Sequence, residues 1–121
     1  MTGSRDQALT AARAAASKQA HDIVVMDVRD LIGITDFFVV AAGSTDRQVR
    51  TIAEEVQRAL RDGGVKPVRR EGQREGRWVL LDFVDFVVHV FHDEEREYYG
   101  LERLWADAAV VPWDDRAASS G

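Results

Sequence analysis

The chain has 121 residues, a formal charge of −5 and no cysteine, and 45% of its residues are hydrophobic. Its length and composition are those of one ordinary globular domain. The absence of thiols excludes disulfides, thiolate metal sites and cysteine nucleophiles, and the acidic balance argues against a broad basic surface for nucleic acid. No apolar stretch approaches the roughly 18–20 residues of a membrane span, and the N-terminus has no apolar signal core, so we expect a cytoplasmic protein.

The first part of the chain predicts one helix and two strands. Helix formers fill residues 6–20, but most are alanines that bury little area, so this helix should be a thin cover. Residues 23–28 are rich in β-branched side chains and predict a strand, followed by a connector at 29–33. Residues 34–43 predict a second strand that is apolar on both faces, which indicates a central position in the sheet.

A strongly amphipathic helix follows the second strand. Thr45 and Gln48 have the spacing of a capping box, in which each side chain satisfies a free backbone N–H at the start of a helix. Gly63 and Gly64 are suited to the C-terminal cap. The buried face of this helix is predicted to contain Val49, Ile52, Ala53, Val56 and Leu60.

The second part of the chain predicts three strands and a closing helix. Residues 65–70 are expected to form an edge strand, because Pro67 cannot donate to a central ladder. A polar loop at residues 71–77 leads to strands at 78–83 and 86–92 and a helix at 93–105.

The resulting order is α-β-β-α-β-β-β-α, with no repeats and no linkers. It predicts a single α/β (α+β) domain over residues 1–109 with a mixed sheet of five strands. We expect the tail, residues 110–121, to be partly disordered.

Most chemical motifs are absent or have the wrong spacing. The sequence contains neither a hydrolase nucleophile elbow nor a phosphate-binding loop. His89 and His92 are three residues apart, which on a strand places them on opposite faces and argues against a shared metal ion. Asp82 and Asp85, after the Gly43-Ser44 turn, suggest a nucleotidyltransferase scaffold. Those enzymes, however, need two carboxylates two residues apart on one strand. We therefore predict no metal site and no cofactor.

The strand at 78–83 is more informative. Its alternation puts Val79, Leu81 and Phe83 on one face, which suits a core covered by helices. The other face has Trp78, Leu80 and Asp82, which suits a face left open. A partly exposed tryptophan is typical of a binding anchor. An equally weighted interpretation is that Trp78 only caps the edge of the core.

Charge is distributed unevenly along the chain. Residues 66–77 have a net charge of +3, and residues 82–107 have a net charge of −6. The loop between the third and fourth strands is thus a basic spot on an acidic body. On the charge signal alone, ordinary solvated loop charge is the favoured explanation.

Several blocks of sequence match one known family in the right order. They are residues 22–24, 34–39, 47–49 and 71–72, then Gly-Arg-Trp-Val-Leu-Leu-Asp-Phe at 76–83, Val-His-Val-Phe at 88–91, and Leu-Glu-Arg-Leu-Trp-Ala-Asp at 101–107. Over residues 7–109 the sequence resembles the ribosomal silencing factor family, RsfS, also called Iojap. Two departures stand out. Phe83-Val84 replaces the usual Tyr-Gly or Leu-Gly, and His92-Asp93-Glu94 replaces a frequent His-Pro-Glu.

The resemblance implies a fold related to nucleotidyltransferases without their active site, and no catalysed reaction. Members of the family bind large-subunit ribosomal protein number fourteen and sterically prevent subunit joining when nutrients are short. Free members are often homodimers. The runner-up hypothesis is a nucleotide-binding protein or a degenerate nucleotidyltransferase-like enzyme.

On this resemblance, the open sheet face and the C-terminal helix should dock on the ribosomal protein. The residues expected to make this contact are Trp78, Leu80, Asp82, Asp85, His89 and Tyr98. The basic residues expected to contact nearby rRNA are Arg69, Arg70, Arg74 and Arg77.

Overall fold

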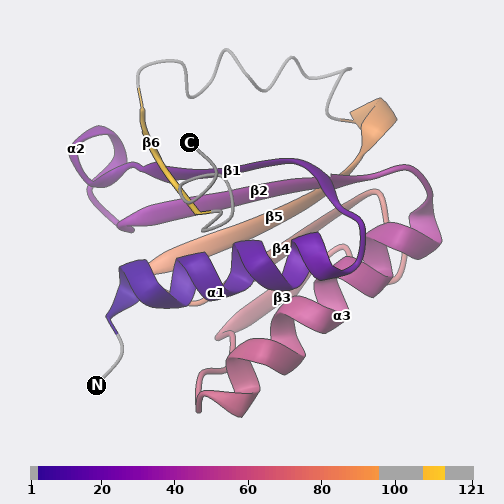
Figure 1. Ribbon diagram of the computed structural model, residues 1–121, viewed down its shortest axis with the longest axis horizontal. Helices are drawn as coiled ribbons and strands as arrows, with labels where there is room; N and C mark the ends of the chain where they lie inside the picture. Colours follow the sequence, from indigo (N-terminus) through magenta and orange to yellow (C-terminus); the bar gives the residue numbers. More distant parts are fainter. Residues whose placement is uncertain (1–2, 96–107, 114–121) are drawn as a thin grey trace, which may run out of the picture.

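The computed structural model describes residues 3–95 and 108–113, which form one sheet with the two long helices on one of its faces (Figure 1). The strands are β1 (His21–Asp27), β2 (Phe37–Gly43), β3 (Arg69–Glu71), β4 (Trp78–Asp82), β5 (Phe86–His92) and β6 (Ala109–Val111). Three helices lie wholly within the described residues, namely α1 (Ser4–Ser17), α2 (Arg29–Ile32) and α3 (Asp46–Asp62). Residues 93–95 are also helical, and the rest of the helix predicted at 93–105, with Tyr98, lies outside the described residues.

The sheet is mixed, as predicted, and has the strand order β3-β4-β5-β2-β1-β6. Strands β2 and β5 are parallel, and all other neighbours are antiparallel. The predicted central position of the second strand is confirmed, since β2 lies between β5 and β1. The edge position predicted for the third strand is also confirmed, although β3 begins only at Arg69, after Pro67.

The prediction of five strands is wrong, because a sixth strand forms in the segment that was assigned to the tail. Strand β6 pairs with β1, placing Val111 opposite Val25. Trp113 packs against the main core and donates a hydrogen bond from Nε1 to the carbonyl oxygen of Ile23, at 3.1 Å. Three residues are too few to show a strand period, so this strand depends on its long-range partner.

Two local expectations need correction. The predicted connector at residues 29–33 contains the single helical turn α2, and β2 begins at Phe37, so Ile34 lies outside the strand with 84% of its surface exposed. Helix α1 is a core element and not a thin cover. Its five buried alanines lie in the main core, because small side chains let a helix approach its neighbours closely (Ala8, Ala11, Ala12, Ala14 and Ala15).

The capping box of α3 is confirmed. Thr45 Oγ1 accepts the Gln48 N–H at 3.0 Å, and Gln48 Oε1 accepts the N–H of Ser44 at 2.7 Å. The predicted apolar stripe of α3 is buried over its whole length. Helix α3 therefore has a fixed start at the end of β2 and a fixed buried face, and both position it beside α1 on one side of the sheet (Figure 1).

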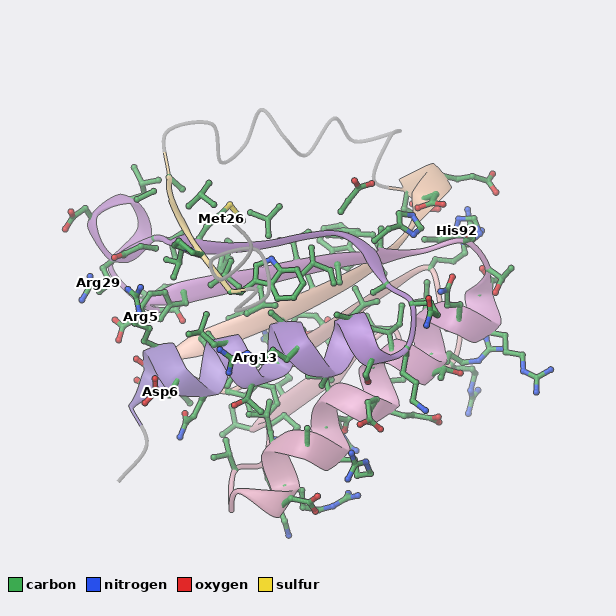
Figure 2. All side chains as sticks on the ribbon, in the orientation of Figure 1. Arg5, Asp6, Arg13, Met26, Arg29 and His92 are labelled. Carbon is green, nitrogen blue, oxygen red and sulfur yellow. The ribbon has the colours of Figure 1, made fainter. Side chains whose placement is uncertain are left out.

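The sheet is buried on both sides, but unequally. The face under α1 and α3 contains most of the core, including Val39 and Val88. A smaller cluster on the opposite face contains Met26, Val40 and Phe91. Figure 2 shows Met26 on the side of the sheet away from α1. Because β2 contributes to both clusters, its apolar character on both faces is explained.

Candidate functional site

Strand β4 has the alternation that the sequence predicts. Val79 and Leu81 are fully buried on the helix side. On the other face Trp78 is 38% exposed, and Leu80 and Asp82 are partly buried. In the register of β4 and β5, Leu80 lies opposite His89, which brings two of the predicted contact residues together.

Trp78 is held in place by aromatic neighbours on β5. Its indole N–H donates to Nδ1 of His89 at 3.2 Å, and its ring centroid lies 4.8 Å from that of Phe91. The His89 ring also makes an edge contact with Phe38, at 5.0 Å between centroids. A large side chain that is already immobile loses little entropy on binding, which suits an anchor.

Burial lowers the pKa of His89 to about 4, so its imidazole is neutral at neutral pH. The Trp78 N–H occupies Nδ1 as an acceptor and therefore assigns the ring proton to Nε2. A neutral histidine can lie under a docked partner without the cost of burying a charge.

A hollow of about 200 Å³ adjoins these residues. It is lined mainly by apolar side chains, and its lining comprises Ile34, Thr35, Phe38, Arg69, Leu80, Asp82, Val84, Val87 and His89. Thr35 Oγ1 is buried and has no hydrogen-bond partner within the described part of the chain. We use the name Trp78 face for the surface formed by Trp78, Leu80, Asp82, Val87 and His89.

The open face predicted from the sequence is smaller than the whole sheet. Met26, Val40 and Phe91 lie on the same side as Trp78, yet at most 1% of each is exposed. On this side the partly exposed residues of β4 and β5 are Trp78, Leu80, Val87 and His89, and Val110 of β6, opposite Met26, is 68% exposed. Sequence reasoning missed Phe38 and Val87. They lie opposite one another on β2 and β5, and this could be predicted only if the parallel pairing of the two strands were known.

The two aspartates predicted for the site have different positions. Asp82 Oδ1 accepts the N–H of Val84 at 2.8 Å, whereas the Asp85 side chain is exposed and its carbonyl oxygen accepts the N–H of Asp36 at 2.8 Å. Val84 has a φ of +74°, so the bend forms although the glycine usual in the family is missing. Asp82 is therefore engaged in shaping the bend, whereas the Asp85 side chain is exposed at the bend itself.

The expected separation of the two histidines is confirmed. His89 lies on the Trp78 face, while His92 Nε2 lies 3.8 Å from Asp46 at the start of α3, where Figure 2 labels it. Within residues 3–95 and 108–113 no three His, Asp or Glu side chains are placed to hold a metal ion.

The four arginines predicted to contact rRNA do not form one patch. Arg77 is half-buried, and its guanidinium lies 3.2 Å from Asp46 and 3.1 Å from Glu95. The hydrogen bond to Glu95 raises the pKa of Arg77 further above its usual value. Arg77 thus connects the β3–β4 loop to α3 and to the helical residues after β5, and its charge is neutralised.

Arg69 and Arg70 are on opposite sides of the sheet. Arg69 pairs with Asp82 in the register of β3 and β4, and its guanidinium contacts Glu71 at 3.0 Å. Arg70 pairs with Leu81, so its side chain is on the side of α3, where it donates to Gln57 at 3.2 Å. Arg74 is exposed in the loop, and its carbonyl oxygen accepts a hydrogen bond from Arg50.

In the described ranges, no helix is both long enough and apolar enough to cross a membrane. The fold and site define a small α/β protein with one partly open sheet face, on which Trp78 lies at the start of β4. Its sequence matches the family model described as "ribosomal silencing factor during starvation" over residues 2–120. The chain belongs to this ribosomal silencing factor family, RsfS.

Relatives and a solved structure agree with this assignment. The chain is 42% identical over 104 residues to the ribosomal silencing factor RsfS of Bacillus subtilis, covering 86% of this chain and 88% of that protein. It is 33% identical over 112 residues to the chloroplastic protein Iojap of Zea mays, covering 88% of this chain and 47% of that protein. A crystal structure of a protein from Chromobacterium violaceum superposes with a TM-score of 0.83 at 35% identity, covering 87% and 88% of the two chains.

Proposed function

We propose that this protein binds the large ribosomal subunit through its ribosomal protein number fourteen and sterically blocks association with the small subunit. Translation would then fall when nutrients are limiting. In this proposal the protein acts in the cytoplasm by occupying a surface and catalyses no reaction, and free copies pair as homodimers. The observation that carries the proposal is the Trp78 face in a chain that belongs to the silencing factor family over nearly its whole length.

The chemistry of the Trp78 face supports a protein partner. Interface hot spots are enriched in tryptophan that fills a desolvated position, and here the indole is oriented by His89 beside an apolar hollow. Specific interfaces bury about 800 Å² on each partner, which one face of a small domain can supply. The exposed Asp85 and the net charge of −5 favour encounter with a basic ribosomal protein.

Two of the four arginines proposed to contact rRNA are less suited to that role. Arg69 and Arg77 are paired with carboxylates, so breaking those pairs would oppose any new phosphate contact. Arg74 and Arg70 have no ion pair among residues 3–95 and 108–113, and we propose that Arg74 is the residue that reaches rRNA beside the docked protein.

The test is co-sedimentation of the Trp78→Glu variant with purified large subunits, together with a pull-down of isolated ribosomal protein number fourteen without RNA. Loss of a hot spot of about 2 kcal/mol or more predicts at least a 30-fold weaker affinity. Arg47→Glu is the control, because Arg47 is exposed in the first turn of α3, on the helix side of the sheet. A folded Trp78→Glu protein that still binds as tightly as the parent would rule out Trp78 as the anchor.

A second measurement separates binding from silencing. Light scattering follows the joining of small and large subunits, and the parent protein should slow or prevent it. The Trp78→Glu variant should leave joining unchanged at the same concentration, whereas Arg47→Glu should inhibit like the parent. Inhibition without binding to the isolated ribosomal protein would point to a different contact on the subunit.

A further inference from the structure

A second hollow lies on the opposite side of the sheet, where the end of α3 meets the edge strand β3. Its volume is about 250 Å³, and it is lined by Gln57, Arg61, Val65, Lys66, Pro67 and Arg70. Three of these six side chains are cationic, in a chain whose net charge is −5. Arg70 is on the side of α3, so this hollow is separate from the Trp78 face.

The carboxylates nearest in sequence to these cations are engaged elsewhere. Asp62, next to Arg61, lies 2.9 Å from Arg58, and Glu71, next to Arg70, lies 3.0 Å from Arg69. Within the described ranges, no acidic side chain lines the hollow or forms an ion pair with its three cations. Three unneutralised cations around one hollow repel each other, so they lower the stability of the fold. Their presence is therefore not explained by folding.

Gln57 orients one of these cations without neutralising it. Its Oε1 accepts a hydrogen bond from Arg70 Nη1 at 3.2 Å, and its amide nitrogen donates to the carbonyl oxygen of Ala53 at 3.3 Å. A glutamate at this position would form a salt bridge with Arg70. With glutamine there, the guanidinium is directed but keeps its full charge for another anion.

The end of α3 does not oppose an anion strongly. The carbonyl oxygen of Leu60 accepts the N–H groups of Gly63 and Val65, and that of Arg61 accepts the N–H of Gly64. The negative end of the helix dipole is thus partly satisfied by the chain itself.

From this arrangement we propose that the hollow formed by Gln57, Arg61, Lys66 and Arg70 binds a phosphate or diphosphate group. Its volume is below that of pockets that enclose whole small molecules, so it takes one end of a ligand. The lining has no aromatic side chain on which a base could stack, so recognition rests on charge and hydrogen bonds. The group can come from a free oligophosphate compound or from an RNA backbone.

The experiment titrates the full chain with inorganic tripolyphosphate by calorimetry and, separately, with a short single-stranded RNA by fluorescence anisotropy. Gln57→Glu should weaken binding about tenfold or more, because it neutralises Arg70 while keeping its position. Arg47→Gln changes the net charge by the same amount at the other end of α3 and should bind like the parent. For RNA, three phosphate contacts predict a slope of about −2 in a plot of log affinity against log salt.

The two arms identify the source of the phosphate. Binding of tripolyphosphate that Gln57→Glu weakens to this extent supports the site with a small oligophosphate as ligand. Binding of RNA alone, weakened to the same extent in this variant, supports the site with an RNA backbone as ligand. If neither probe binds near physiological salt, or if Gln57→Glu and the parent bind equally, the proposal is wrong. Neither arm contains ribosomal protein, so the outcome is independent of the docking proposal.

Discussion

The indole N–H of Trp78 donates to Nδ1 of His89 on the neighbouring strand, at 3.2 Å. This bond joins the most exposed aromatic residue of the sheet to one whose pKa is depressed by burial. It requires the neutral form of His89 with the proton on Nε2, so the geometry of the Trp78 face depends on one protonation state.

Acid should therefore destabilise the fold through His89. The pKa of His89 is about 4 in the folded state and near 6.5 when unfolded, so the unfolded chain binds more protons between these values. The stability contributed by neutral His89 is complete above about pH 6.5 and is lost as the pH falls toward 4. Between pH 6.5 and pH 4, the free energy of unfolding measured in urea should fall by about 2 kcal/mol more in the parent than in His89→Gln. Parallel curves for the two proteins would contradict the prediction.

Val84→Gly should stabilise the protein. Val84 is a β-branched residue at φ +74°, where an L side chain strains the backbone and glycine does not. The side chain is 54% exposed, so little packing is lost. After the entropy cost of glycine in the unfolded chain, we expect a gain of about 1 kcal/mol in the free energy of unfolding. The urea midpoint should rise with an unchanged slope, and Val84→Ala, which removes the side chain but not the positive φ, should gain less.

Gly72→Ala should destabilise the β3–β4 loop. Gly72 has a φ of +79°, and a Cβ atom there would lie 2.0 Å from the carbonyl oxygen of Trp78. The backbone must move to admit even one methyl group, at an expected cost above about 2 kcal/mol. Thermal unfolding measures this cost. Gly3→Ala is the control, because a Cβ at Gly3 meets nothing within 4 Å. Equal unfolding temperatures for the two variants would show that the loop adapts freely.

Arg77→Met should lower the melting temperature at neutral pH. Methionine keeps much of the aliphatic part of the arginine side chain. It removes the positive charge that Asp46, Glu94 and Glu95 share, so these carboxylates repel one another. The loss should shrink in about 1 M salt, which screens the repulsion between these carboxylates. Arg47→Met removes an exposed cation of the same region and should have a smaller effect. A loss that is the same at low and at high salt would mean that Arg77 acts through packing alone.

Local rules predicted the parts of the fold that depend on short stretches of chain. The capping box at Thr45 and Gln48 is a four-residue motif. The alternation along β4 follows from the two-residue period of a strand, and a single sequence displays both. The exposure of Trp78 on the face opposite Val79 and Leu81 was predicted for the same reason.

The remaining parts depend on pairing between distant segments. Strand β6 has only three residues and is specified by β1, and the separation of Arg69 from Arg70 matters only because α3 packs beside β3. The bend at Val84 keeps its shape without glycine because Asp82 accepts its N–H and Phe83 stacks on Phe86, with ring centroids 4.7 Å apart. Both contacts join residues only two or three positions apart, but the positive φ of Val84 that they support is not visible in the sequence.

The pairing of β6 with β1 also sets the order in which the molecule can be completed. Because β6 is made last, a nascent chain must hold the outer edge of β1 unpaired until residue 111 has left the exit tunnel. An unpaired edge next to a central apolar strand is a template for pairing with another chain. Early termination upstream of β6 should therefore yield aggregation-prone fragments rather than a shortened but active protein.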